Sequence, residues 1–311
     1  MAITAAEVKK LRETTGAGMM DCKKALTATE GDMDKAIEWL REKGLATAQK
    51  KASRVAAEGL CKVLVSEDAK KAVVVEVNAE TDFVAKNDKF QGYVAQVAEQ
   101  AMETEAPDVE AFLAETWKFD NTKTVNEALA GQIAVIGENM NIRRFTKINE
   151  ENGFVAPYTH MGGKIGVLVD VETDVINDAV KEMANNVAMQ VAAMKPVYVS
   201  TDDVSEEYKQ KELAILVAQA KNDPKNAGKP DNIIEKMVTG RLNKELKEVC
   251  LLQQEYVKAE NKENVGQYVA SVAKANGAKI TIKSFIRFET GEGIEKREEN
   301  FAEEVAKQMN A

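Results

Sequence analysis

A carboxylate and a large aromatic ring stand side by side directly after an apolar run, in the four residues Thr81, Asp82, Phe83 and Val84. The run, residues 72–77, is rich in β-branched side chains and predicts a largely buried strand. Because a strand end is a rigid support, a Phe–Asp pair on the turn beyond it is well placed to be pressed into another molecule. The alternative is that Phe83 covers the protein's own core and Asp82 caps the next helix.

Residue types for covalent chemistry are sparse. The carboxylates of Glu80 and Asp82 could form an acid–base pair, but acidic residues this close together are usually a solvated turn, and no second catalytic group is evident. The chain has one histidine, His160, which removes most histidine-based catalytic schemes and most metal sites. The sequence contains neither the P-loop motif G-x-x-x-x-G-K-[ST] nor the dinucleotide-binding motif G-x-G-x-x-G, so we do not expect this chain to hold a nucleotide by either route. We therefore expect that the chain has no catalytic residue, no metal site and no cofactor, and that it is not an enzyme.

Composition limits the classes of partner and the compartment. The 311 residues carry 42 Lys and Arg against 51 Asp and Glu, a net charge of −9, which disfavours nucleic-acid binding through the general surface. Three cysteines, Cys22, Cys61 and Cys250, lie far apart, which argues against a disulfide framework and for a reducing compartment. No secretory signal and no apolar run of 18 residues is present. We expect a cytoplasmic protein with no membrane and no nucleic-acid partner.

The first 45 residues predict three short helices. Thr4 with Glu7 forms a capping-box pattern at the start of the first helix. Residues 19–28 predict the second helix, and the third is expected to stop at Gly44. A helical bundle this small is more plausible as a docking module than as an enzyme. Residues 46–56 then predict a basic helical linker.

The middle of the chain contains a repeated pattern. Residues 60–65 and 72–77 predict a β-hairpin, followed by a helix over residues 94–102. Residues 164–194 repeat the apolar strand, the acidic Glu-Thr-Asp turn and the helix, but without the aromatic residue. We therefore expect an α+β fold with a two-lobed core of duplicated antiparallel strand-strand-helix units. The predicted lobes are residues 57–148 for the N-terminal lobe, and residues 149–204 with 251–290 for the C-terminal lobe.

An insertion interrupts the second lobe. Apolar residues at helical spacing predict two amphipathic helices over residues 205–220 and 231–250. The simplest structure for residues 205–250 is a projecting, coiled-coil-like helical hairpin. Its role is either structural or a contact with a second copy or another partner. Residues 291–311 predict a C-terminal helical module.

Long blocks of this sequence resemble bacterial translation elongation factor Ts. The blocks are VKKLRETTGAGMMDCKKAL (residues 8–26), EVNAETDFVAK (residues 76–86) and residues 136–144, 160–169, 285–289 and 291–295. They occur in the family's order over almost the whole chain. The resemblance implies an N-terminal ubiquitin-associated-like helical domain, the two-lobed core, the hairpin and the C-terminal module. The segment that connects the hairpin helices, residues 222–230, is long for the family.

The resemblance also implies a function. Members of the family act as guanine nucleotide exchange factors: they bind elongation factor Tu·GDP, disturb its Mg²⁺ and phosphate site and promote GDP release, so that GTP can bind. By this resemblance, Thr81, Asp82, Phe83 and Val84 would displace the Mg²⁺ of the partner. The residues implied in partner binding are Lys9, Arg12, Met19, Met20, Gly137, Asn139, His160, Phe301 and Val305.

Alternatives to these roles remain. Lys9 and Arg12 could belong to a solvated helix face, and His160 could be a core or sheet-edge histidine. The protein could also be a passive scaffold whose N-terminal domain binds peptides or nascent chains. The hairpin leaves open a homodimer or a complex with two copies of each protein.

Overall fold

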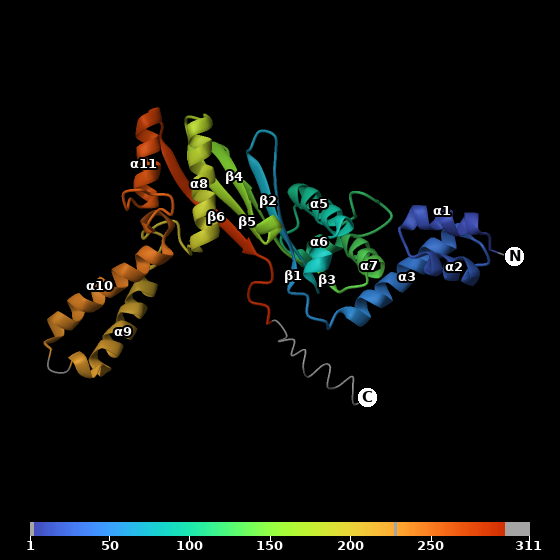
Figure 1. Ribbon diagram of the computed structural model, residues 1–311, viewed down its shortest axis with the longest axis horizontal. Coiled ribbons are helices and arrows are strands. Elements are labelled where there is room, and N and C mark those ends of the chain that lie inside the picture. Colours follow the sequence, from blue (N-terminus) through green and yellow to red (C-terminus); the bar gives the residue numbers. More distant parts are fainter. Residues whose placement is uncertain (1–2, 227–228, 296–311) are drawn as a thin grey trace.

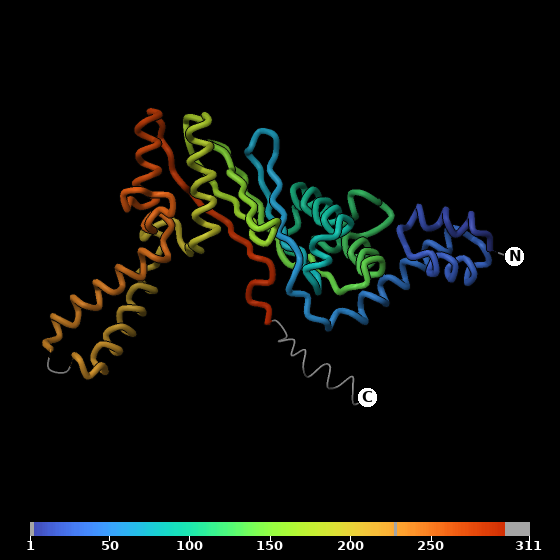
Figure 2. Tube along the Cα trace, viewed as in Figure 1, coloured from blue at the N-terminus to red at the C-terminus, as the bar shows by residue number. Residues whose placement is uncertain are grey.

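The protein is elongated, with its strands in the middle. The computed structural model describes residues 3–226 and 229–295, so the predicted C-terminal helix with Phe301 and Val305 lies outside the described residues. The N-terminal helices form one end of the molecule and a helical hairpin forms the other (Figure 1). The trace in Figure 2 follows the chain from the first end, through the strands, out to the hairpin and back. The α+β class predicted from the sequence is confirmed.

Three helices build the N-terminal end: α1 (Ala5–Thr15), α2 (Met19–Ala28) and α3 (Met33–Lys51). The capping box at the start of α1 is present, with the Glu7 N–H donating to Thr4 Oγ and the Glu7 carboxylate accepting from the Thr4 N–H. A small apolar core holds the three helices together. Its buried members are Val8, Leu11, Cys22, Ala25, Leu26 and Ala36.

The prediction that the third helix stops at Gly44 is wrong. Helix α3 runs through Gly44 to Lys51, because Gly44 lies against α7 (Val125–Ile136) instead of at a turn. A Cβ at Gly44 would stand 3.6 Å from the carbonyl oxygen of Ala130, so glycine allows the two helices to approach closely. The basic linker begins as the last turns of α3, which bind the helical end of the molecule to the core.

Two three-stranded antiparallel sheets form the centre. The first has the order β1 (Glu58–Val65), β2 (Lys71–Ala79) and β3 (Met140–Asn149). The second has the order β4 (Gly153–His160), β5 (Ile165–Thr173) and β6 (Ile280–Glu289). The 3₁₀ turn η1 (Met161–Gly163) joins β4 to β5.

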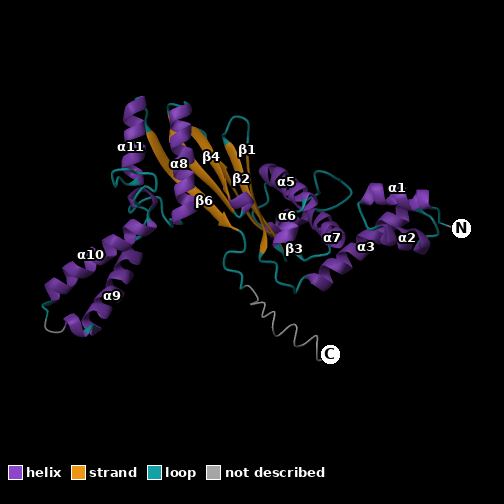
Figure 3. Cartoon of the chain, viewed as in Figure 1, coloured by secondary structure: helices purple, strands orange, loops and turns teal. Residues whose placement is uncertain are grey.

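Helices cover the outer faces of both sheets (Figure 3). On the first sheet these are α5 (Asp88–Glu103), α6 (Val109–Ala114) and α7; on the second they are α8 (Asp178–Met194) and α11 (Val265–Asn276). The inner faces of the sheets meet through a smaller apolar cluster. Its buried members are Cys61, Ala72, Val74, Ile148, Val155, Leu168 and Phe288. Burial of this apolar surface on both faces of β2 and β5 explains why these two strands are almost continuously apolar.

The two sheets share a detailed irregularity. In each, the register shifts on the central strand directly after a buried acid, at Glu76 in β2 and at Asp170 in β5. In each, a glycine on the neighbouring strand, Gly59 or Gly153, lies so close to the central strand that a Cβ would overlap a carbonyl oxygen. The repeat predicted from the sequence therefore has a structural counterpart at matching positions.

Asp170 is a buried acid with a costly environment. It is 7% exposed, its Oδ1 has no hydrogen-bond partner, and Ser284 Oγ donates to its Oδ2 over 3.4 Å. Burial raises the pKa of the Asp170 carboxyl to about 6, and the adjacent Glu150 carboxylate adds to the rise. Glu150 is itself bound to Lys283 Nζ at 2.9 Å.

Asp170→Asn is expected to stabilise the fold at neutral pH. The folded pKa lies above the unfolded value of about 3.9, so the contribution of Asp170 to stability is complete below that value and is lost as pH rises through 6. Because asparagine does not ionise, the variant does not lose this stability as the pH rises. We expect the free energy of unfolding to increase by about 1–2 kcal/mol at pH 7.5 and by much less at pH 4.5. Urea unfolding at the two pH values measures this; an equal change at both would contradict it.

The insertion forms the projecting hairpin. It consists of α9 (Glu206–Asn222), the short turn η2 (Pro224–Asn226) and α10 (Asp231–Val249). After α10 the turn η3 (Leu251–Gln253) leads back to the second sheet. The two helices pack through an apolar seam that includes Leu216, Ile234 and Val238. No helix among residues 3–226 and 229–295 is long and apolar enough to cross a membrane.

Candidate functional site

Phe83 projects from the protein surface. Thr81 caps the four-residue helix α4 (Asp82–Ala85), with its Oγ accepting from the Val84 N–H at 3.4 Å. This short turn directs Val84 and Ala85 inward, where Val84 joins the core of the first sheet. The Phe83 side chain is left 80% exposed. The alternative in which Phe83 covers the core is therefore wrong, as is a capping role for Asp82.

Glu138 fixes the start of α4. Its Oε2 accepts from the Thr81 N–H at 3.0 Å and its Oε1 accepts from Thr81 Oγ at 2.7 Å. Glu138 directly follows Gly137, which ends α7 in the left-handed conformation with φ +89°. A two-pronged bond to one carboxylate holds both the position and the orientation of the residue it binds. The exposed ring of Phe83 is thus mounted on a fixed base.

A second contact joins the same two loops to the end of α3. The Asn139 N–H donates to Glu80 Oε1 at 2.5 Å, and the Asn139 side chain donates to the carbonyl of Arg54 at 2.7 Å. Lys51 Nζ donates to the carbonyl of Gly137 at 2.6 Å. Asn139 is only 2% exposed, so its side chain connects segments of this chain instead of presenting a contact surface. Gly137 is exposed, as its predicted role in partner binding requires.

The carboxylates of Glu80 and Asp82 do not form an acid–base pair. Glu80 binds Asn139 and lies 3.6 Å from Arg54, whereas Asp82 binds Lys86 Nζ at 2.7 Å. The hydrogen bond from Lys86 holds the pKa of Asp82 below its usual value, which favours the ionised form over a proton donor. In the described part of the chain no group of three or more His, Cys, Asp or Glu residues has the arrangement of a metal site.

His160 lies at the end of the edge strand β4 and is exposed, so it is a sheet-edge histidine and not a core histidine. Its Nδ1 stands 3.0 Å from the hydroxyl of Tyr158, and the two rings stack with centroids 5.9 Å apart. Met161, the next residue, is 65% exposed at the start of η1. The turn η1 packs against β1, with Gly163 facing the side chain of Leu60. The structure thus sets the His160 segment of the second sheet against the first.

The N-terminal residues form a separate exposed surface. Met19 is 55% and Met20 is 64% exposed, so two consecutive apolar side chains face solvent at the start of α2. Lys9 and Arg12 are exposed on α1, and Lys9 pairs loosely with Glu13 at 3.7 Å. Helices α1 and α2 pack on α3, at the end of the molecule beyond the sheets (Figure 1). A partner that contacts these residues and Phe83 together must therefore be large.

Glu138 was not singled out by the sequence analysis. It lies inside one of the blocks that carry the family resemblance, residues 136–144, but a carboxylate after a helix end is usually solvated. The signal that could have revealed it is a carboxylate next to the glycine that ends a helix, paired with the free N–H groups at the start of another helix. Their sequence separation of 57 residues hides this pairing from local reasoning.

Comparison with known proteins decides the family. A family model described as elongation factor TS matches residues 80–292. The match begins directly before residues 81–84, which we name the Phe83 loop, and ends in the turn after β6. The chain belongs to the elongation factor Ts family. Elongation factor Ts of Clostridium botulinum (strain Alaska E43 / Type E3) is 53% identical over 307 residues, covering 99% of each chain.

Other members of the family are equally similar along their full length. Elongation factor Ts of Clostridioides difficile (strain 630) is 55% identical over 307 residues, again with 99% of each chain covered. That of Halothermothrix orenii is 50% identical over 310 residues, covering 100% of this chain and 99% of the relative. The chain is thus a member of a translation elongation factor family over its whole length.

Proposed function

We propose that this protein is a cytoplasmic guanine nucleotide exchange factor. It binds elongation factor Tu·GDP, disturbs the Mg²⁺ and phosphate site of that GTPase and releases GDP, so that GTP can bind during translation elongation. It acts by binding alone, with no covalent chemistry and no cofactor of its own. Membership of the elongation factor Ts family supports the exchange role.

The exposed and rigidly mounted ring of Phe83 carries this proposal. Among the described residues Phe83, at 80%, is the most exposed of the large apolar side chains, and its base is held by two hydrogen bonds to Glu138. Such a ring is suited to enter a partner as a preformed wedge, because little conformational entropy is lost on binding.

Magnitudes require further contacts. An acceleration of GDP release by roughly ten-thousand-fold corresponds to about 5.5 kcal/mol. Burial of one phenylalanine side chain supplies roughly 1.5–3 kcal/mol. The remainder is assigned to the exposed N-terminal residues Met19 and Met20 and to the His160 segment, which would contact other parts of elongation factor Tu.

Three further roles are proposed. Lys9, Arg12, Gly137, Phe301 and Val305 are assigned to partner binding through the family resemblance. The hairpin presents half-exposed apolar side chains at Ile215, Ile233 and Met237, which suit a contact with a second copy, in a homodimer or in a complex with two copies of each protein. Asn139 is assigned to positioning, because it is buried.

Reciprocity tests the proposal against a passive scaffold. If this protein weakens GDP binding, then GDP weakens the binding of this protein by the same factor. We expect its dissociation constant for elongation factor Tu to be roughly 100-fold or more larger with saturating GDP than without nucleotide. Calorimetric titration in both conditions measures this. Equal affinities in the two titrations would support a scaffold and refute the exchange role.

A further inference from the structure

A tight turn, which we name the clasp turn, follows β6 at residues 289–292. The Glu292 N–H donates to the carbonyl of Glu289 at 3.1 Å, and Gly291 takes the left-handed conformation with φ +73°. A Cβ at Gly291 would overlap the carbonyl oxygen of Ala57, directly before β1. The clasp turn belongs in sequence to the second sheet but is inserted against the backbone of the first.

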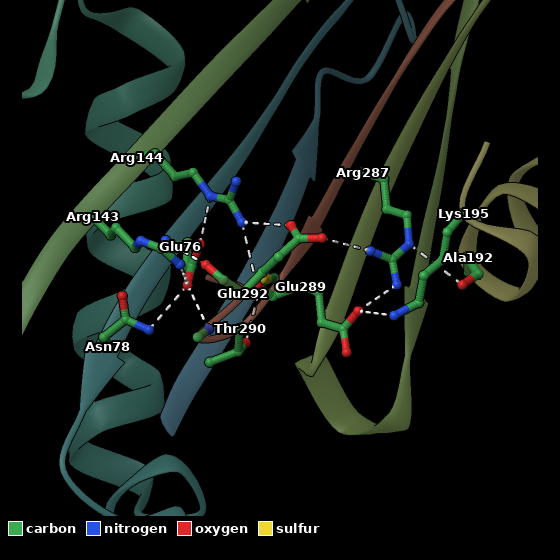
Figure 4. Close-up of polar contacts among 12 residues, drawn as sticks. Glu76, Asn78, Arg143, Arg144, Ala192, Lys195, Arg287, Glu289, Thr290 and Glu292 are labelled. Atoms are coloured by element: carbon green, nitrogen blue, oxygen red, sulfur yellow. Dashed lines mark hydrogen bonds and ion pairs between the residues drawn. The ribbon is translucent and has the colours of Figure 1, made fainter. Parts of the chain in front are cut away.

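The carboxylate of Glu76 holds this turn. Glu76 is fully buried on β2, and its Oε1 accepts from the Gly291 N–H at 2.8 Å and from Asn78 Nδ2 at 3.0 Å. Arg143 donates to the same oxygen at 3.0 Å, and Arg144 Nε donates to Oε2 at 2.5 Å (Figure 4). Burial alone would raise the pKa of Glu76, but these hydrogen bonds outweigh it and hold the pKa below its usual value. The carboxylate is therefore charged, and both of its oxygens accept hydrogen bonds.

The two arginines extend from Glu76 to the clasp turn itself. Arg143 Nη2 donates to the carbonyl of Glu292 at 2.5 Å, and Arg144 Nη2 donates to the carbonyl of Glu289 at 3.3 Å. The Arg144 guanidinium also lies 4.1 Å from the ring centroid of Phe288. Figure 4 shows these side chains converging on the turn from β3. Polar and cation–π contacts from the first sheet thus surround the end of β6.

The second sheet holds the clasp turn from the other side. Glu289 accepts from Arg287 Nη2 and from Lys195 Nζ, each at 2.7 Å (Figure 4). The Thr290 N–H donates to the carbonyl of Lys164 at 2.9 Å, directly after η1. Thr290 Oγ also lies 3.4 Å from Cys61 Sγ on β1. One residue of the turn therefore touches both the strand that begins the first sheet and the segment that carries His160 and Met161.

We propose that Glu76 is a positioning residue for nucleotide exchange: through the clasp turn it fixes the His160 segment relative to the Phe83 loop. The inference rests on the proposed exchange function. Glu76 lies on the same strand that leads into the Phe83 loop, so the strand that mounts one contact segment also anchors the other. Two contact segments held at a fixed spacing bind one partner with a high effective concentration, which a loosened spacing reduces.

The second sheet provides a matched control for this role. Asp170 occupies the position in β5 that Glu76 occupies in β2, at the same register shift. The group that donates to Asp170 is the hydroxyl of Ser284 on the neighbouring strand, not the backbone of a turn. Asp170→Asn therefore makes the same chemical change as Glu76→Gln, at the equivalent buried site, without touching the clasp turn.

The first measurement is amide hydrogen exchange on the full chain, alone. In Glu76→Gln we expect faster exchange in peptides covering residues 160–166 and 289–294, and unchanged exchange in residues 19–28. Gly291→Ala, which displaces the turn by overlap with Ala57, is expected to give the same pattern. Asp170→Asn is expected to leave both peptides protected.

Unchanged protection of residues 160–166 in the folded Glu76→Gln and Gly291→Ala variants would overturn the proposal. If Glu76→Gln does not fold, the result for Gly291→Ala alone decides.

The second measurement follows GDP release from elongation factor Tu at increasing concentrations of each variant. For Glu76→Gln and Gly291→Ala we expect the half-saturating concentration to rise roughly tenfold and the maximal rate to fall by a smaller factor, because the His160 segment also contributes to the acceleration. A fall in the maximal rate with an unchanged half-saturating concentration, or an equal effect of Asp170→Asn, would overturn the role of Glu76. If the unaltered protein gives no acceleration, the exchange function fails, whereas the hydrogen-exchange pattern still tests the clasp turn.

Discussion

Phe83→Ala is expected to slow GDP release at saturating concentration by roughly 10- to 100-fold. The estimate converts the roughly 1.5–3 kcal/mol gained by burying a phenylalanine side chain into a change of rate. Because the ring is 80% exposed, its removal leaves no cavity, and the unfolding transition should change little. Stopped-flow release of a fluorescent GDP analogue measures the rate, and thermal unfolding checks the fold.

Phe119→Ala is the matched control for this variant. Phe119 is a second exposed phenylalanine, 40% exposed. Its ring packs at a tilt against Trp117 with centroids 5.1 Å apart, and it lies in no segment assigned to partner binding. Its loss should leave the release rate unchanged. An unchanged rate in Phe83→Ala would remove the ring from the mechanism. Unfolding of Phe83→Ala would instead return the ring to a structural role.

Glu138→Ala is expected to lower the maximal release rate by roughly tenfold while the half-saturating concentration changes little. The substitution removes both hydrogen bonds to Thr81, so α4 and its aromatic ring lose their fixed orientation although the ring remains present. Misplacement of a group that acts at the reacting centre affects the rate more than the affinity. The same stopped-flow titration separates the two quantities.

Two companion variants distinguish positioning from a general loss of stability. Glu138→Gln keeps the shape and one acceptor oxygen, and should recover most of the rate. Thr81→Val removes the hydroxyl that donates to Glu138 Oε1 and that also caps the Val84 N–H, so it should reproduce part of the defect, and the double variant should lose less than the sum of the two single losses. Additive effects of the two substitutions, or no recovery by glutamine, would contradict a positioning role for Glu138.

Local patterns predicted the elements well. Thr4 and Glu7 are three residues apart and interact as a capping box, and the apolar spacing of Leu242 and Leu246 marks the buried face of α10. These features depend on neighbours in sequence, which fixed helical and strand periods bring together. The α+β class could be predicted from the repeated pattern for the same reason.

Features that depend on distant segments could not be predicted. Gly44 has the appearance of a helix end, but a close contact with Ala130 keeps α3 continuous. The partner of Thr81 lies 57 residues away, and the partner of Glu76 in the clasp turn lies 215 residues away. Sequence alone also left the direction of Phe83 open, because a helix of one turn carries too few residues to define an apolar face.

The central claim is that this protein accelerates nucleotide release. The most direct test is stopped-flow release of a fluorescent GDP analogue from purified elongation factor Tu, with excess unlabelled GDP and increasing amounts of the unaltered protein. The account predicts a large acceleration of release that saturates as the concentration of this protein rises. No acceleration, in a sample where complex formation is demonstrated separately, would contradict the account and leave a binding scaffold in its place.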